Sequence, residues 1–374
     1  MVKRVMICTG GTGGHVFPAL ALARQLKEEM PSLYICFAGG GLSQNRFFDK
    51  EAYPFKEVLC GYFPLKNPLK CVASAGKVMA GVIQSGRILD EVKPDLVIGF
   101  GSYHTLPLLI ATKLRGVPYI LHAADSIPGK VIRLMSGSAL ATGITFPMAR
   151  KYLRGPVVDV GSPLREDLRQ GRPEKEEALA RYGLKAGKKT VLIFGGSQGA
   201  AFINEMMETA SKSLHSLNGA VQFIHLTGLK GDTSGLVKAY REKQFDACVK
   251  PFEDKMQYAW TAADLVISRA GAGTIAEQIA FEVPGILIPY PYASENHQEM
   301  NAEFMAGEVG GARVMTEAGY SSAGFDLLMK QLITNEDELF TKMQEAIRNF
   351  KERAPAEDMC SLVKKLMPTT TGES

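Results

Sequence analysis

Two glycine-rich turns carry the residues of this sequence best suited to chemistry. Gly-Gly-Thr-Gly-Gly-His spans residues 10–15 and Gly-Gly-Ser-Gln-Gly-Ala spans residues 195–200, and each turn follows an apolar run and precedes a helix-like run. Such a turn presents backbone N–H groups at the start of a helix, where the dipole adds partial positive charge, so it can hold a diphosphate. Many α/β proteins use a similar turn only to pass from strand to helix. The presence of two turns favours two phosphorylated substrates.

A third turn, at residues 268–274, leads into a helix-like run that carries Glu277. A carboxylate in this place accepts hydrogen bonds from ribose hydroxyls in dinucleotide sites, and it equally complements the helix dipole. Both interpretations of Glu277 stay open on the residues alone. Neither of the first two turns continues into Gly-Lys-Ser/Thr or has Gly-x-Gly-x-x-Gly spacing, which disfavours ATP hydrolysis.

Alternating strand-like and helix-like runs must position these turns. In the first half, apolar runs at residues 4–9, 33–38, 96–99, 119–122 and 141–145 alternate with helix-like runs such as 18–29 and 105–114. The second half repeats the pattern with runs at 190–194, 222–226, 265–268 and 285–288. This alternation predicts α/β structure with two doubly wound parallel sheets. The ligand crevice of such a sheet lies beyond the carboxyl ends of its strands, where the glycine turns fall.

Glycine and proline interrupt the pattern within residues 154–163, which places a domain boundary there. We expect an N-terminal domain at 1–160 and a C-terminal domain at 161–345. The run 336–366 reads as one amphipathic helical segment. Residues 346–374 are then expected to form a last helix that packs back on the first domain, followed by a frayed polar tail.

Composition narrows the classes of protein. A chain of 374 residues with 46% hydrophobic residues exceeds what one core usually organises. No stretch approaches the ~20 apolar residues of a membrane span, and the start does not resemble a signal peptide, so we expect the protein to stay in the cytoplasm. Six cysteines without a Cys-x-x-Cys pair, together with the absence of Asp-x-Asp, predict reduced thiols and no metal site. A formal charge of +4 does not argue for nucleic acid.

Five segments together resemble the MurG family, the peptidoglycan N-acetylglucosaminyltransferases that convert lipid I to lipid II. They are residues 10–23, Gly-Phe-Gly-Ser-Tyr at 99–103, the turn at 195–200, residues 263–277, and His297-Gln298 with Asn301. The motifs occur in the family's order over nearly the whole chain. The resemblance implies the GT-B fold, in which two Rossmann-like domains face a cleft, and it implies no cofactor.

The resemblance also implies that the second domain holds UDP-N-acetylglucosamine. It places the turn at 195–200 on the diphosphate, Glu277 on the ribose, and Gln298 on the sugar hydroxyls. The backbone near Phe252 and Glu253 is placed on the uracil. The residues implied in donor binding are Thr12, Gly13, Gly14, Asp125, Arg165, Ser197, Gln198, Phe252, Glu253, Arg269, Ala272, Gly273, Thr274, Glu277, His297 and Gln298.

Physical chemistry agrees with such a donor site. UDP gains negative charge as the anomeric bond breaks, and fixed N–H dipoles with one guanidinium stabilise that charge where it develops. Arg165 and Arg269 lie beside glycine turns and suit this role. An isolated arginine is nevertheless more often part of an ordinary surface ion pair.

The acceptor is expected in the first domain. The resemblance places the diphosphate of the lipid against residues that comprise Thr12, Gly13, Gly14, His15, Gly101, Ser102 and Tyr103. His15 is the candidate base for the acceptor hydroxyl, because histidine titrates in the right range and direct attack inverts the anomeric carbon. The alternative is a neutral histidine that only orients the loop.

One segment departs from the family. Most members carry His-Glu-Gln-Asn, whereas this chain has His-Ala-Ala-Asp at residues 122–125. The position of the donor-contacting asparagine is therefore occupied by Asp125, whose charge would repel a diphosphate unless the side chain were protonated or paired. This departure motivates an alternative function, a non-catalytic UDP-sugar-binding scaffold of the cell-wall machinery.

A lipid acceptor requires a membrane-facing surface. Lysines at 66, 70 and 77 lie beside apolar residues within 65–83, a pattern that suits an anionic bilayer. Periodicity alone favours an ordinary amphipathic helix whose apolar stripe is buried. We expect a peripheral enzyme at the cytoplasmic face of the inner membrane, near other cell-wall synthesis proteins. The alternatives are a GT-B enzyme that glycosylates another lipid such as diacylglycerol and, less favoured, an oxidoreductase.

Overall fold

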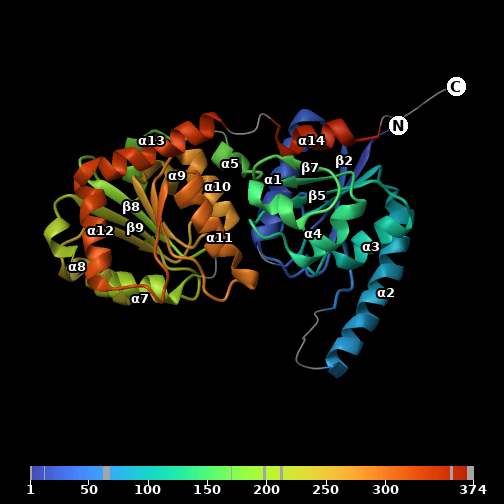
Figure 1. The fold of residues 1–374 in the computed structure, drawn as a ribbon, viewed down its shortest axis with the longest axis horizontal. Helices are drawn as coiled ribbons and strands as arrows, with labels where there is room; N and C mark the ends of the chain where they lie inside the picture. Colours follow the sequence, from blue (N-terminus) through green and yellow to red (C-terminus); the bar gives the residue numbers. More distant parts are fainter. Residues whose placement is uncertain are drawn as a thin grey trace. The chain divides into compact units, whose positions relative to one another are not determined.

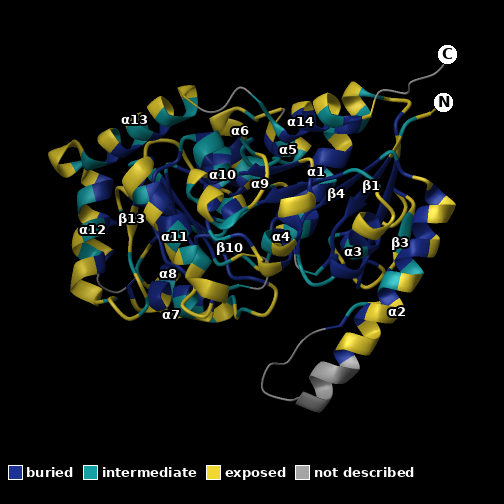
Figure 2. Ribbon diagram, turned by 45° about the vertical axis from the view of Figure 1, so that its right-hand side comes forward, coloured by how far each residue is buried: buried dark blue, intermediate teal, exposed yellow. Residues whose placement is uncertain are grey.

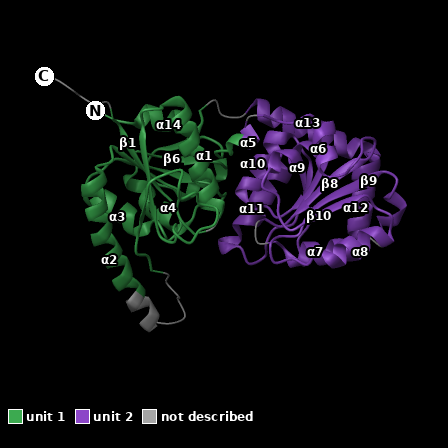
Figure 3. Cartoon of the chain, turned by 180° about the vertical axis from the view of Figure 1, so that it is seen from behind, with its two compact units in different colours: residues 1–166, 355–374 green, residues 167–354 purple. Residues whose placement is uncertain are grey.

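The chain folds into two compact units, each built around one parallel β-sheet (Figure 1). The structure is a computed structural model that describes residues 2–11, 13–61, 68–169, 171–196, 199–210, 214–353 and 357–368, with the side chains of 68–73 outside the description. The first unit comprises Met1–Glu166 and Pro355–Ser374, and the second comprises Asp167–Ala354 (Figure 3). The chain therefore leaves the first unit once and returns to it near its end.

The first unit holds a seven-stranded sheet in the order β3-β2-β1-β4-β5-β6-β7. All neighbouring strands are parallel, and the order is that of a doubly wound Rossmann sheet. The strands are β1 Arg4–Cys8, β2 Tyr34–Gly39, β3 Phe55–Glu57, β4 Leu96–Gly99, β5 Tyr119–Ala123, β6 Ala141–Ile144 and β7 Val157–Asp159. The helices are α1 Gly13–Glu29, α2 Pro68–Val92, α3 Leu106–Leu114, α4 Lys130–Met135 and α14 Met359–Leu366, with the short α5 Glu166–Arg169 at the division between the units.

The second unit holds a six-stranded parallel sheet in the order β10-β9-β8-β11-β12-β13. Its strands are β8 Lys189–Phe194, β9 Val221–Leu226, β10 Ala247–Lys250, β11 Leu265–Ser268, β12 Gly285–Leu287 and β13 Ala312–Val314. Its helices are α6 Lys175–Arg181, α7 Ala201–Ala210, α8 Ser234–Glu242, α9 Met256–Ala262, α10 Ala272–Phe281, α11 His297–Glu303, α12 Ser322–Thr334 and α13 Leu339–Glu352. Both units are thus doubly wound.

Helices cover both faces of each sheet, because alternate side chains of every central strand point to opposite faces. In β1, Val5 and Ile7 pack under α1 and α14, whereas Met6 packs under α2, α3 and α4. In the second unit, α7, α8 and α12 cover one face, and α6, α9 and α10 cover the other. The central strands are accordingly buried and the outer helix faces exposed (Figure 2).

The end of the chain differs from the single helical segment expected over 336–366. Two helices stand there, and their apolar faces belong to different cores. Met343 of α13 packs in the second unit, while α14 packs on α1 of the first unit, where Lys364 pairs with Glu29 at 2.7 Å. The units divide between Glu166 and Asp167 and again between Ala354 and Pro355, rather than after residues 160 and 345.

The structure also bears on membrane-spanning helices and on metal-binding clusters. Among the helices that the structure describes, none is long and apolar enough to cross a membrane. Within the same described residues, no three histidine, cysteine or acidic side chains group closely enough to hold a metal ion.

Candidate functional site

The first glycine turn joins β1 to α1, and its glycines are required by close packing. A Cβ added to Gly10 would lie 2.7 Å from the carbonyl oxygen of Gly40 and 2.8 Å from Cβ of His104. Gly11 has φ +84°, a conformation that side chains disfavour. Gly13 and Gly14 open α1, whereas Thr12 lies outside the described residues.

The segment 101–103 follows β4 and faces this first turn. An added Cβ at Gly101 would lie 3.9 Å from Cε1 of His15, and one at Gly11 would lie 3.2 Å from Oγ of Ser102. Ser102 has φ +77°, a strained value for a residue with a side chain, and such strain concentrates at functional sites. Tyr103 is half-buried. The structure thus brings His15 and Gly101, and Gly11 and Ser102, close together at this edge of the sheet.

His15 and His122 have different environments at this edge of the sheet. His15 is half-buried in the first turn of α1, and its carbonyl oxygen accepts a hydrogen bond from Oγ1 of Thr9 at 2.9 Å. His122 is 1% exposed in β5, and burial lowers its pKa to about 4 despite a contact of 3.3 Å between Nε2 and the Gly161 carbonyl oxygen. His122 is therefore a neutral core residue. Asp125 follows β5 and is half-buried.

Arg165 belongs to the first unit rather than to the donor half expected from the sequence. Its guanidinium carbon lies 5.5 Å from the ring centroid of Phe17, a residue of α1. The ring of Phe17 in turn packs against Gly13, where an added Cβ would approach it to 2.9 Å. This cation–π contact places the arginine beside the first turn of α1.

The second glycine turn joins β8 to α7. An added Cβ at Gly195 would collide with Ala200, and one at Gly199 would collide with the carbonyl oxygen of Thr227. Gly196 and Gly199 have φ +86° and +81°. Ser197 and Gln198 lie outside the described residues. Close packing thus requires glycine at particular positions of both turns that follow the central strands.

Glu277 lies in α10, one turn after the segment Ala272, Gly273 and Thr274 that opens this helix. Its Oε2 accepts a hydrogen bond of 2.6 Å from Nε1 of Trp260 in α9. Trp260 is buried, with an edge-to-face contact to Phe194 at 5.7 Å. The only tryptophan of the chain therefore orients this carboxylate, a role that its position in the sequence did not suggest.

Arg269 is buried and engaged within its own unit. Its Nη1 donates to the carbonyl oxygens of Ile288 and Pro289 at 3.2 and 3.1 Å, and its Nη2 pairs with Glu317 at 2.5 Å. Its guanidinium carbon also lies 5.3 Å from the ring centroid of Tyr290. The side chain thus joins the end of β11 to the loop after β12 and to Glu317, so Arg269 belongs to a buried network rather than to an ordinary surface ion pair.

His297 and Gln298 open α11 close to this loop. Oε1 of Gln298 accepts from the backbone N–H of Tyr290 at 3.0 Å, and Nδ1 of His297 lies 2.9 Å from the Ser294 carbonyl oxygen. Asn301 is fully buried and donates to the Ala270 carbonyl oxygen at 3.0 Å. The segments 269–274 and 289–298 are thereby held together at the carboxyl edge of the second sheet.

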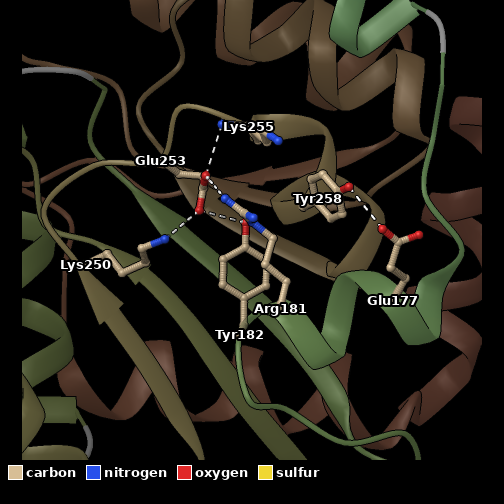
Figure 4. Close-up of polar contacts among 7 residues, drawn as sticks. All are labelled: Glu177, Arg181, Tyr182, Lys250, Glu253, Lys255 and Tyr258. Atoms are coloured by element: carbon tan, nitrogen blue, oxygen red, sulfur yellow. Dashed lines mark hydrogen bonds and ion pairs between the residues drawn. The ribbon is translucent and has the colours of Figure 1, made fainter.

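Phe252 and Glu253 lie in the loop between β10 and α9, at the same edge. Phe252 is half-buried, and the carboxylate of Glu253 is turned into the unit (Figure 4). The family resemblance implied that the backbone of this loop contacts the uracil, and it implied no role for the Glu253 carboxylate.

Comparisons with known proteins agree with this geometry. The glycosyltransferase family 28 N-terminal domain matches residues 5–144, and the glycosyltransferase family 28 C-terminal domain matches residues 190–357. The chain is 42% identical over 365 residues to the UDP-N-acetylglucosamine–N-acetylmuramyl-(pentapeptide) pyrophosphoryl-undecaprenol N-acetylglucosamine transferase of Protochlamydia amoebophila, covering 97% of this chain and 96% of the relative. A transferase of the same name from Chlamydia pneumoniae is 34% identical and covers 84% and 85% of the two chains.

Solved structures show the same architecture. Acinetobacter baumannii MurG superposes with a TM-score of 0.76 at 26% identity, covering 98% of this chain and 99% of that chain. A UDP-glucose:anthocyanidin 3-O-glucosyltransferase in complex with UDP has a TM-score of 0.69 at 14% identity, covering 95% and 94%, a likeness of fold alone. The two parallel-sheet units have the GT-B fold.

Proposed function

The chain belongs to the MurG family within glycosyltransferase family 28, and from this premise we propose how its residues carry the reaction. The protein is an N-acetylglucosaminyltransferase that moves N-acetylglucosamine from UDP-N-acetylglucosamine to lipid I and so forms lipid II. We propose the C4 hydroxyl of the muramoyl sugar as nucleophile and inversion at the anomeric carbon. One observation carries the assignment of sites: β1 and β8, the central strands, are each followed by a glycine turn in which glycines such as Gly10 and Gly195 have no room for a side chain.

The donor is proposed to bind the second unit. Backbone N–H groups of the turn at 195–200 and of the segment Ala272 to Thr274 stabilise the charge that develops on the departing diphosphate. Glu277, oriented by Trp260, accepts from the ribose hydroxyls. His297 and Gln298 contact the sugar. We assign Arg269 to the support of this loop, because its Nη1 and Nη2 donate to the carbonyl groups and the carboxylate described above.

The acceptor is proposed to bind the first unit. The turn at 12–14 and the segment 101–103 hold the lipid diphosphate through backbone N–H groups, and Arg165 supplies positive charge beside α1. His15 takes the proton from the attacking hydroxyl as the sugar transfers. His122 is 1% exposed, too deeply buried to meet the acceptor hydroxyl, and burial lowers its pKa to about 4, which makes it a weaker base. Asp125 is proposed to border the donor phosphates, where its charge requires a paired or protonated state.

A membrane-facing surface is proposed on α2, which extends outward from the first sheet (Figure 1). Met79 and Ile83, one helical turn apart, are 62% and 59% exposed, and Lys77 is exposed beside them. Lysines 66 and 70 and the apolar residues expected around them lie outside the described residues or side chains. Exposed apolar groups with lysines suit an anionic bilayer, so we place the enzyme peripherally at the cytoplasmic face of the inner membrane.

Acceptor choice is the decisive experiment. Purified protein is incubated with radiolabelled UDP-N-acetylglucosamine and either lipid I or diacylglycerol, both in the same detergent. Transfer to lipid I alone supports the proposal, and transfer to diacylglycerol alone refutes it. Binding of UDP-N-acetylglucosamine by calorimetry without turnover would instead favour the scaffold that the His-Ala-Ala-Asp segment suggested.

A further inference from the structure

Glu253 carries a buried carboxylate in the loop between β10 and α9 (Figure 4). Its side chain is 2% exposed, yet each oxygen has two donors. Oε2 accepts from Nζ of Lys250 at 2.8 Å and from Oη of Tyr182 at 3.2 Å. Oε1 accepts from Nη2 of Arg181 at 3.1 Å and from the backbone N–H of Lys255 at 3.0 Å. The carboxylate therefore joins the end of α6, the end of β10 and the start of α9.

The carboxyl group of Glu253 is ionised at neutral pH. Burial by itself raises the pKa of Glu253, but the hydrogen bonds from Lys250, the Lys255 amide and Arg181 outweigh burial and lower the pKa to about 2. A buried carboxylate with four donors is costly to disturb, because removing one partner leaves the others unpaired in a desolvated place. The contacts thus hold the loop in one conformation.

The loop that Glu253 anchors has unused backbone groups. Among the residues that the structure describes, no hydrogen bond engages the backbone N–H or C=O of Phe252 or Glu253. Phe252 is half-buried and Asp254 is exposed, so Glu253 is the one side chain of the three turned fully inward. The loop lies at the carboxyl edge of the sheet, where ligands bind in open α/β folds. Backbone donors and acceptors are therefore held ready for a ligand.

A uracil edge fits such groups. Uracil presents an accepting O4 beside a donating N3–H, which match one backbone N–H and one backbone C=O. Cytosine presents a donating amino group beside an accepting N3, the reverse order. The helix that follows the loop, α9, carries Trp260, which orients the proposed ribose ligand Glu277. One helix thus connects the base-reading loop to the ribose site.

We propose that Glu253 is a positioning residue that holds the backbone of Phe252 and Glu253 in the conformation that reads the uracil of the sugar nucleotide. This inference rests on the proposed function, since it takes the donor to be a uridine nucleotide. It adds that base selectivity depends on a charged network beneath the loop, although the carboxylate itself touches no part of the substrate.

The test is Glu253→Gln in the full chain, assayed with lipid I and UDP-N-acetylglucosamine. The substitution keeps the size of the side chain but leaves one accepting oxygen where the carboxylate offered two, so either Lys250 and Tyr182, or Arg181 and the Lys255 backbone N–H, lose their acceptor. We expect KM for the donor to rise about tenfold, with kcat within about twofold and KM for lipid I unchanged. The ratio of the inhibition constants of CDP and UDP should fall toward one.

Glu177→Gln is the matched control. Glu177 is an exposed carboxylate of α6, and its Oε1 accepts only from Oη of Tyr258, at 3.0 Å, among the contacts drawn in Figure 4. The same chemical change at this position should leave the donor KM and the CDP-to-UDP ratio at wild-type values. A rise equal to that of the Glu253 variant would overturn the inference.

The remaining outcomes also decide. Unchanged donor KM and base selectivity in Glu253→Gln would overturn the inference, as would a fall in kcat alone. If that variant does not fold, Tyr182→Phe removes one hydrogen bond to Glu253 and keeps the aromatic ring. An unchanged KM for UDP-N-acetylglucosamine in this variant would also overturn the inference. Calorimetric titration with UDP distinguishes failure of the proposed function from failure of the role of Glu253. A wild-type protein that does not bind UDP refutes the proposed function. Wild-type affinity for UDP in every variant refutes only the role of Glu253.

Discussion

Acidification should destabilise the second unit through Glu253 in a calculable way. The pKa of this carboxyl is about 2 in the folded protein, against 4.5 for the ordinary group. Because the folded pKa is lowered, its stabilisation is fully present above pH 4.5 and is lost as the pH falls toward 2. The full contribution is roughly 3 kcal/mol, at 1.36 kcal/mol for each pH unit between the two values. About 2 kcal/mol of it should be lost by pH 3.

The assay compares urea unfolding of the wild type and Glu253→Gln between pH 6 and pH 3. Trp260 is the only tryptophan, is 1% exposed and belongs to the second unit, so its fluorescence reports the unfolding of that unit. Other carboxyl groups titrate in both proteins and cancel in the difference between them. The free-energy difference between wild type and variant should therefore shrink by about 2 kcal/mol across this range.

A difference that stays constant from pH 6 to pH 3 would refute the reasoning, because it would show that Glu253 has the same pKa in the folded and unfolded chain. Glu177→Gln provides the reference for an exposed carboxyl. Its free-energy difference from wild type at pH 6 should remain within about 0.5 kcal/mol.

Three further predictions concern activity and membrane binding. Trp260→Phe removes the donor to Glu277 but keeps an aromatic ring, so KM for UDP-N-acetylglucosamine should rise about tenfold in steady-state assays, and an unchanged KM would remove the tryptophan from the site. His15→Ala should lower kcat by about 100-fold or more without weakening calorimetric binding of UDP, and unchanged turnover would exclude it as the base. Ile83→Glu should reduce sedimentation with anionic vesicles, whereas Leu327→Glu, at a comparably exposed apolar position of the second unit, should not; equal losses would contradict a surface on α2.

The central strands could be predicted from the sequence, and the edge strands could not. Strands such as β1, β4, β8 and β11 are buried on both faces, so they appear as continuous apolar runs. The four strands at the sheet edges, β3, β7, β10 and β13, are three or four residues long and largely half-buried or exposed. Their short mixed segments carry no comparable signal, because much of their pairing surface lies outside the core.

The helical end of the chain shows a second limit. Periodicity predicts an amphipathic helix from the spacing of its apolar residues. It does not indicate which core those residues enter. α13 and α14 enter the cores of different units, a choice made by the shapes of the surfaces that receive them.

By itself, the sequence determined where glycine turns follow the central strands, because the spacing of glycines after an apolar strand is a local property. The tertiary structure alone decided which charged side chains pair with one another inside the protein. Glu253 meets Arg181 across 72 positions of the chain, and Arg269 meets Glu317 across 48. Pairings of that range depend on how the strands are ordered in the sheet and how the helices lie on it, and no local pattern of residues records them.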